Sequence, residues 1–79
     1  MDLMQHLGNV IKYHRKKAGL SQKSLADVAG VGKTVVFDIE KGKETVQFQS
    51  IVNVLKALNI TIELNSPLMA KYNSEHENS

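Results

Sequence analysis

The 79-residue sequence predicts an all-α fold of four to five helices followed by one short β-strand, and three patterns support this prediction. Apolar residues recur at three- and four-residue steps over residues 4–18 and 48–58, as they do on the buried face of a helix. Between these segments, residues 21–42 contain two shorter stretches of the same kind separated by Gly30. Residues 60–64 alternate branched apolar residues with polar ones, a pattern typical of a half-buried strand. The sequence therefore predicts a compact helical domain that ends in an extended segment.

The two longer helices are expected to supply much of the core. In the first, over residues 4–18, the apolar stripe consists of Leu3, Leu7, Val10, Ile11 and His14. Gly19 ends this helix, and Lys16 and Lys17 lie in its last turn, where the helix dipole favours cations. In the fourth helix, over residues 48–58, the inward positions are Phe48, Ile51, Val52, Val54, Leu55 and Leu58. Gln47 is a weak N-cap for the fourth helix, and Asn59 ends it.

Residues 21–42 predict two short helices joined by a tight turn. Ser21 is suited to cap the first helix, Gly30 suits a turn that needs a positive φ angle, and Gly42 stops the second helix, at residues 33–41. The inward positions are Leu25, Ala26 and Ala29 before the turn and Val31, Val36 and Ile39 after it. In such a pair, the first helix crosses a DNA backbone and the second presents its N-terminal residues to base edges in the major groove.

Twelve residues keep one register around this pair: Arg15, Gly19, Leu20, Ser21, Gln22, Leu25, Ala26, Gly30, Val31, Ile39, Glu40 and Gly42. In this register the chain resembles the phage-repressor/Cro family of helix-turn-helix domains, also called the Xre family. The resemblance implies a compact lambda-repressor-like helix-turn-helix domain that binds DNA. It also implies a partly buried ion pair between Arg15 and Glu40, joining the first helix to the third. We therefore interpret Arg15 as a structural residue.

Positive charge is concentrated in the segment that would face DNA. The net charge of the chain is +2, but residues 12–43 contain eight lysines and arginines against three acidic residues, an excess of +5. Beyond Leu64 the balance is −1. A basic run is often only a solvated helix face. Its coincidence with the helix-turn-helix pattern favours DNA binding instead, because neutralising phosphates supplies much of the affinity for DNA.

Eight residues are predicted to form the DNA-binding site: Gln22, Gly32, Lys33, Thr34, Phe37, Asp38, Lys41 and Lys43. In the family that the chain resembles, the position of Gln22 hydrogen-bonds a phosphate and braces the recognition helix. Lys33 and Thr34 begin that helix, where a lysine donates to guanine and a threonine offers a hydroxyl and a methyl group to thymine. The alternative for Lys33 is a phosphate contact without base readout. Gly32 has no side chain, so the backbone can approach DNA closely.

The remaining candidates have competing interpretations. Phe37 lies one turn after Lys33 and outside the inward face, so its ring either meets a thymine methyl or packs against a neighbouring helix. Asp38 either accepts a hydrogen bond from a cytosine amino group or only braces Lys41 or Lys33. Lys41 and Lys43 are expected to contact phosphates, unless they form only a solvated face.

Residues 60–64 depart from the common pattern of the resembled family, many members of which have a fifth helix here. A lone strand leaves backbone groups unpaired along both edges. The simplest solution is pairing with the same strand of a second copy across a two-fold axis, which makes the protein a homodimer. The alternative is an extended arm lying on its own domain. We assign the DNA-binding domain and its dimer strand to residues 1–65 and a flexible tail to residues 66–79, with disorder from about Lys71.

Other classes of protein find little support. The sequence has no cysteine for a disulfide or thiolate metal site, and no apolar run of membrane-spanning length or secretory pattern, so we expect a cytoplasmic protein. Residues 30–34 resemble the end of a nucleotide-binding P-loop, but Asp27 stands where that motif needs a glycine. The scattered His6, His14 and His76 suit neither catalysis nor metal binding. We expect neither enzymatic activity nor a bound cofactor.

The expected function is that of a homodimeric, sequence-specific repressor that binds double-stranded DNA at a palindromic operator. Within the resembled family, the pattern from Gly30 to Gly42 followed by the strand at residues 60–64 is most similar to HipB-type antitoxins. That resemblance implies repression of the protein's own operon and a HipA-like kinase toxin as partner. The alternatives are a stand-alone phage-type or chromosomal repressor without a toxin, and a module that bridges proteins without reading DNA.

Overall fold

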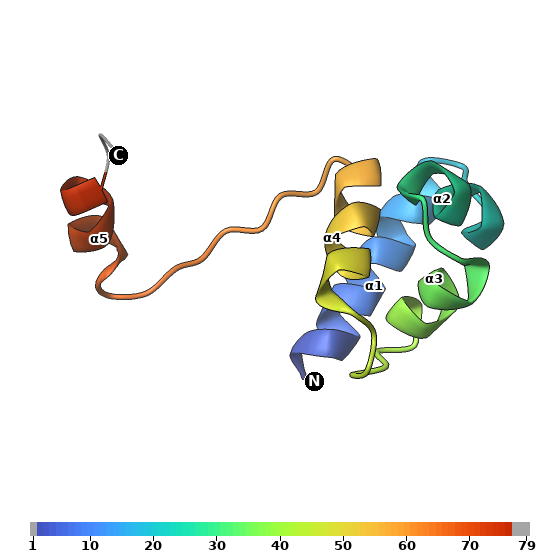
Figure 1. Ribbon diagram of the computed structural model, residues 1–79, viewed down its shortest axis with the longest axis horizontal. Coiled ribbons are helices and arrows are strands. Elements are labelled where there is room, and N and C mark those ends of the chain that lie inside the picture. The colour runs from blue at the N-terminus through green and yellow to red at the C-terminus, as the bar shows by residue number, and fades with distance from the viewer. Residues whose placement is uncertain (1, 77–79) are drawn as a thin grey trace.

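The computed structural model describes residues 2–76, and within them the chain forms five α-helices (Figure 1). They are α1 (Leu3–Lys17), α2 (Gln22–Ala29), α3 (Lys33–Glu40), α4 (Phe48–Ala57) and α5 (Met69–His76). Helices α1 to α4 pack together into one body, whereas α5 lies apart from it at the end of an extended segment. The predicted all-α class and the four helices of the body are confirmed, with ends within one residue of those expected.

Two helices of the body, α1 and α2, begin where a short polar side chain accepts a hydrogen bond from a first-turn amide. Ser21 Oγ accepts a hydrogen bond from the Ser24 N–H at 3.0 Å, which confirms Ser21 as the cap of α2. Asp2 Oδ1 accepts from the Gln5 N–H at 2.8 Å at the start of α1, a cap that the sequence analysis did not identify. Gln47 precedes α4 and makes no side-chain capping bond, as expected for a weak N-cap.

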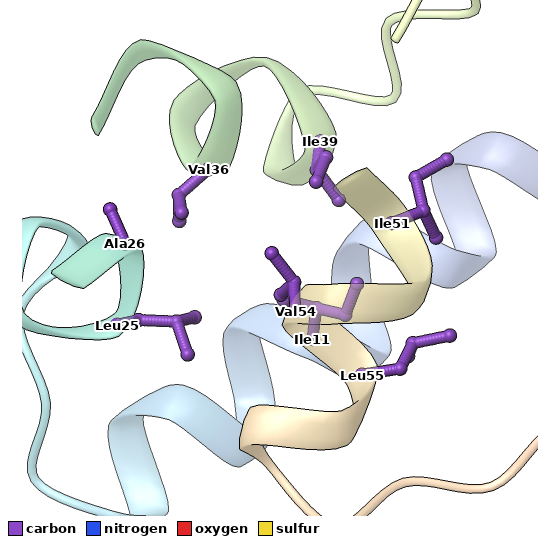
Figure 2. Close-up of a cluster of buried hydrophobic side chains, with 8 residues drawn as sticks. All are labelled: Ile11, Leu25, Ala26, Val36, Ile39, Ile51, Val54 and Leu55. Carbon is purple, nitrogen blue, oxygen red and sulfur yellow. The ribbon is translucent and has the colours of Figure 1, made fainter. Parts of the chain in front are cut away.

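The core is formed by side chains from all four helices of the body, which converge on one interior (Figure 2). Its fully or almost fully buried members are Ile11, Leu25, Ala26, Val36, Ile39, Ile51, Val54 and Leu55. All eight lie on the predicted inward faces. Burying a large aliphatic side chain contributes about 1.5–3 kcal/mol, so this cluster is the main source of stability for the body.

Three residues expected to face inward are exposed instead. Leu3 is 76% exposed and Phe48 is 70% exposed, and both are the first residue of their helix. His14 is exposed on the side of α1, with its Nδ1 2.7 Å from the carbonyl oxygen of Val10. Helical periodicity identifies a face of the helix, but it does not show how far along that face the neighbouring helices extend.

Gly8 is a structural residue that the sequence analysis missed. At this position α1 passes so close to α3 that a Cβ atom would collide with the carbonyl oxygen of Ile39 and lie 3.1 Å from that of Glu40. Only a glycine allows this approach of two helix backbones. Gly42, with a φ angle of 80°, lies in a similar position against Gln5.

Residues 60–66 form an extended arm that leaves the body after α4 (Figure 1). Over residues 2–76 no segment is assigned as a strand, because the single chain offers this arm no neighbour to pair with. Ile60 packs against the core, but Ile62 and Leu64 are 53% and 78% exposed. The alternative of an arm lying on its own domain is therefore seen at Ile60 but not at Ile62 or Leu64.

The expectation of disorder from about Lys71 is wrong for residues 71–76, which belong to α5. Ser66 opens this helix: its hydroxyl accepts from the Leu68 N–H at 3.2 Å and its carbonyl accepts from the Met69 N–H at 3.1 Å. Pro67 follows directly as the second residue of the turn from Ser66 to Met69, a position where the fixed φ angle of proline is favoured. The expectation for residues 77–79 falls outside the described residues.

Candidate nucleic-acid interface

The turn between α2 and α3 fixes the direction in which α3 leaves the body. Gly30 ends α2 with a φ angle of 73°, and the N–H of Val31 donates to the carbonyl oxygen of Ala26 at 3.0 Å. Gly32 then caps α3 in an extended conformation, without a side-chain bond. A residue with a Cβ atom is strained at such a positive φ angle, so a glycine at position 30 favours this turn.

Helix α3 has one buried face and one exposed face. Val36 and Ile39 have no exposed surface, whereas Lys33 and Thr34 at the start of the helix are exposed. Phe37, one turn after Lys33, is 46% exposed. The first turn of α3 is therefore presented to the outside by a helix that is held in place by its opposite face.

Two shallow pockets lie side by side on this exposed face. One is lined by Lys33 and Thr34, and the other lies between α1 and α3 beside Lys12 and Lys41. Gln22 and Phe37 line both pockets, so the two form one continuous surface that α1, α2 and α3 share. We refer to the lining residues Gln22, Lys33, Thr34, Phe37, Lys41 and Lys12 as the α3 face. Lys12 was not among the predicted site residues, although it belongs to the basic run.

A buried ion pair connects the helices beneath the α3 face. Arg15 donates from Nε to Glu40 Oε2 at 2.6 Å and from Nη2 to Glu40 Oε1 at 3.1 Å, which confirms the expected pair. A third bond runs from Arg15 Nη1 to the carbonyl oxygen of Leu20 at 2.9 Å. The two side chains are only 10% and 4% exposed. Such a bidentate pair fixes α1 against α3 and depends on both partners being present.

The protonation of Arg15 follows from this geometry. The hydrogen bonds that Arg15 donates to Glu40 raise the pKa of Arg15 above its ordinary value, burial opposes this shift, and the nearby negative charge of Glu40 adds to it. Because the guanidinium is already charged at any physiological pH, the raised pKa means that Arg15 stays charged inside the body.

Gln22 is tied to the same carboxylate. Its Nε2 donates to Glu40 Oε1 at 3.1 Å, so Glu40 accepts from both Arg15 and Gln22. The sequence analysis expected Gln22 to brace the recognition helix, and this bond from α2 to the last residue of α3 is such a brace. The expected phosphate contact of Gln22 stays a prediction.

Two other predicted residues, Asp38 and Lys41, contact neighbouring side chains. Asp38 pairs with Lys43, with 3.6 Å between Oδ2 and Nζ, and not with Lys41 or Lys33, the partners named in the alternative interpretation of Asp38. Lys41 instead lies over the ring of Phe37, 5.4 Å from its centroid. A cation over an aromatic face is weakly attracted to it, so this contact orients both side chains at the edge of the α3 face.

The ion pairs explain where the excess positive charge of residues 12–43 lies. All three acidic residues of this segment are paired: Asp27 with Lys23, Asp38 with Lys43 and Glu40 with Arg15. The excess of +5 therefore belongs to five lysines: Lys12, Lys16, Lys17, Lys33 and Lys41. Three of these five are in the α3 face, so its charge is not cancelled by neighbouring carboxylates.

Two further observations concern other classes of site. Among residues 2–76, no group of three or more histidine, cysteine, aspartate or glutamate side chains is placed to hold a metal ion. Within the same residues, none of the helices combines the length and the apolar character that crossing a membrane requires. The α3 face is a surface where polar side chains from α1, α2 and α3 meet.

The fold and the α3 face define a class of protein, the small DNA-binding helix-turn-helix transcription regulators. The chain belongs to the helix-turn-helix family, whose model matches residues 11–65. It is 38% identical over 61 residues to an uncharacterized HTH-type transcriptional regulator, y4mF, of Sinorhizobium fredii (strain NBRC 101917 / NGR234), covering 77% of this chain and 80% of that protein. It is 27% identical over 62 residues to the control protein C.SmaI of Serratia marcescens, covering 78% and 74% of the two chains.

Solved structures share the same fold. A chain of a HipA-HipB-O2-O3 complex matches with a TM-score of 0.75 and 19% identity, over 85% of this chain and 94% of that one. A chain of a HipB-O2 20mer complex matches with the same TM-score and identity, over 85% and 93%. At this level of identity the similarity concerns the fold.

Proposed function

We propose that this protein is a homodimeric repressor that binds double-stranded DNA in a sequence-specific way through the α3 face. The observation that carries the proposal is the exposure of Lys33 and Thr34 at the start of a helix whose opposite face is completely buried. A rigid helix with an exposed N-terminal turn is what readout in the major groove requires. The uncancelled charge of Lys12, Lys33 and Lys41 supports phosphate neutralisation beside it.

The eight predicted residues take distinct roles in this proposal. Gln22 donates to a phosphate, with the first amides of α2 beside it, and Lys41 and Lys43 contact phosphates further along the backbone. Lys33 reads guanine, Thr34 and Phe37 meet a thymine methyl, and Asp38 accepts from a cytosine amino group. Gly32 keeps the start of α3 close to the duplex. The exposed position of Phe37 supports a contact outside the body.

Dimerisation gives such a repressor its operator geometry. Pairing of residues 60–64 with the same residues of a second copy would satisfy the backbone groups that the extended arm leaves open. It would also cover Ile62 and Leu64, which are exposed in the single chain. The two α3 helices would then meet successive major grooves about 34 Å apart on a palindromic operator.

The proposed biological role is that of an antitoxin that represses its own operon and binds a HipA-like kinase toxin. The likeness of fold to the HipB chains supports this proposal, since those structures are complexes of HipB with HipA or with a DNA 20mer. A stand-alone repressor is the second candidate, favoured by the similarity in sequence to a transcriptional regulator and a control protein.

Binding to the DNA upstream of the gene, measured as a function of salt concentration, tests the DNA-binding proposal. Lys33→Ala is expected to weaken binding by about 1–3 kcal/mol at one operator position if Lys33 reads a base, and to weaken all sequences alike if it contacts only phosphate. Lys17→Ala is the matched control, because Lys17 is an exposed lysine at the end of α1 and outside the α3 face. Equal effects of the two substitutions would contradict the assignment of the site.

The partner is tested by co-expression with the neighbouring gene. An antitoxin is expected to purify as a stable complex with a kinase-like product of that gene, and the complex should footprint the shared promoter. Purification of the dimer alone, together with specific footprinting, would support the stand-alone repressor. If the protein binds no DNA at all, the remaining candidate function is a module that bridges proteins.

A further inference from the structure

An apolar stripe that begins at Leu68 and continues on α5 is left exposed by the rest of residues 2–76. Leu68 and Tyr72 are 69% and 53% exposed, one helical turn apart, and Glu75 continues the same side by a further turn. None of the eight residues of α5, all of which the structure describes, is buried. The ring of Tyr72 stacks on that of His76, with 4.3 Å between centroids. A helix of this length is marginal in water, so packing against another surface must support it.

A groove with apolar walls lies at the C-terminal end of α4. It is lined by Val52, Leu55, Lys56, Ile60, Thr61 and Ile62. Ile60 and Ile62 are the first part of the arm, so the chain that forms one wall of the groove then runs away from it (Figure 1). The arm therefore carries α5 away from the groove of its own chain.

We propose that this groove binds α5 of a second copy of the chain, so that the two copies of the protein exchange their C-terminal helices. The proposal rests on the dimer described above and names a further contact within it. Two identical strands related by a two-fold axis pair in the antiparallel direction. When residues 60–64 pair over their whole length, Ile62 lies opposite Ile62 of the other copy and Leu64 lies opposite Ile60.

This register directs each α5 toward the α4 helix of the other copy. Beyond Leu64 the chain continues past Ile60 of its partner copy, which is the residue where the groove begins. Pro67 and the start of α5 follow within three to five residues, a reach of about 10–18 Å for an extended chain. The exchanged helix therefore arrives at the groove without any change in the arm.

Charge at the two surfaces supports this occupant. Lys56 is the charged residue among those that line the groove. Glu75 lies on the same side of α5 as Leu68 and Tyr72. A docked α5 therefore brings the Glu75 carboxylate to the Lys56 ammonium at the edge of the apolar contact. An exposed pair of this kind contributes little affinity, but it favours one orientation of the helix in the groove.

Disulfide trapping tests the exchange, because the natural sequence has no cysteine. One chain carries Val52→Cys in the groove, and a second chain with a tag of different size carries Tyr72→Cys in α5. After co-expression and mild oxidation, we expect a disulfide-linked species that contains one chain of each size. Val28→Cys replaces Val52→Cys in the control, since Val28 is 65% exposed on α2 and outside the groove.

A separate variant distinguishes failure of the exchange from failure of the dimer. Ile62→Cys alone should form a disulfide between two copies at the centre of the paired strands. If Ile62→Cys links two chains but Val52→Cys and Tyr72→Cys do not, the dimer stands and the helix exchange is overturned. If Ile62→Cys does not link and the protein sediments as a monomer, both proposals are overturned.

A second measurement does not depend on cysteine chemistry. Leu68→Asp is expected to raise the dissociation constant of the dimer by about tenfold or more, because it removes the burial of a leucine. Ala70→Asp is the matched control, because Ala70 is exposed and lies two residues after Leu68, on the other side of α5, and it should leave the dissociation constant within about twofold. Equal dissociation constants for Leu68→Asp and the unaltered protein would overturn the exchange.

Discussion

The body and the C-terminal arm contain similar apolar residues but use them in opposite ways. In the body, Ile11, Val36 and Val54 have no exposed surface, and side chains from four helices share one interior. In the arm and α5, Leu64 and Leu68 are 78% and 69% exposed. The core of the body is closed within one chain, whereas the arm has the composition of a buried segment and is left uncovered in the single chain. In the function proposed above, the body reads DNA and the arm assembles the dimer.

The largest expected effect is on the body, at Glu40. Glu40→Ala should lower the free energy of unfolding by about 3–5 kcal/mol, because it leaves the buried guanidinium of Arg15 without its partner. It also removes the acceptor of the Gln22 side chain. Thermal unfolding followed by circular dichroism measures this loss.

The control for Glu40 is the exposed pair of Lys23 and Asp27, whose side chains are 70% and 66% exposed. Asp27→Ala should change the free energy of unfolding by no more than about 1 kcal/mol, because water and salt screen such pairs. An unchanged melting temperature for Glu40→Ala would contradict the structural role of its ion pair.

The next effect concerns the contact of α1 with α3. Gly8→Ala should destabilise the body by about 1–3 kcal/mol, because its methyl group meets backbone atoms of Ile39 that cannot move independently. Gly32→Ala is the control, since a Cβ there meets nothing closer than 4.0 Å and the φ angle is an ordinary −74°. If both variants melt at the same temperature, the close approach at Gly8 is not a requirement of the fold.

The smallest effect on the body is expected from the arm. Leu64→Asp should change the free energy of unfolding of the dilute protein by no more than about 0.5 kcal/mol, because the side chain is exposed in the single chain. The melting temperature of the unaltered protein should rise with concentration as dimers form, and that of Leu64→Asp should not. A concentration-dependent melting temperature in both proteins would place the dimer contact elsewhere.

The body could be predicted from the sequence because its signals are local. Ser21 and Gly30 mark the ends of α2, and helical spacing identifies Val36 and Ile39 as the buried side of α3. Arg15 and Glu40 are 25 positions apart, and their ion pair was expected only because of the family resemblance. Local patterns determine helices, but they do not by themselves state which distant groups meet.

The errors share one physical cause, which is dependence on neighbours that are remote in sequence. Phe48 has the right spacing for the core, yet no helix covers its end of α4. Gly8 is required because the backbone of α3, about 30 positions further along the chain, crosses there. For the same reason the extended conformation of residues 60–64 could be predicted, whereas its pairing depends on a second molecule.

The double use of Glu40 has a consequence for genetic experiments. The carboxylate of Glu40 orients both Arg15, which fixes α1 against α3, and Gln22, which is proposed to contact a phosphate. Substitutions of Glu40 therefore cannot separate loss of repression from loss of folded protein. A screen for derepressed mutants should therefore return Glu40 among variants with low cellular abundance. Variants with substitutions of Lys33 should be recovered at normal abundance instead, because the Lys33 side chain is not one of those that hydrogen-bond Glu40.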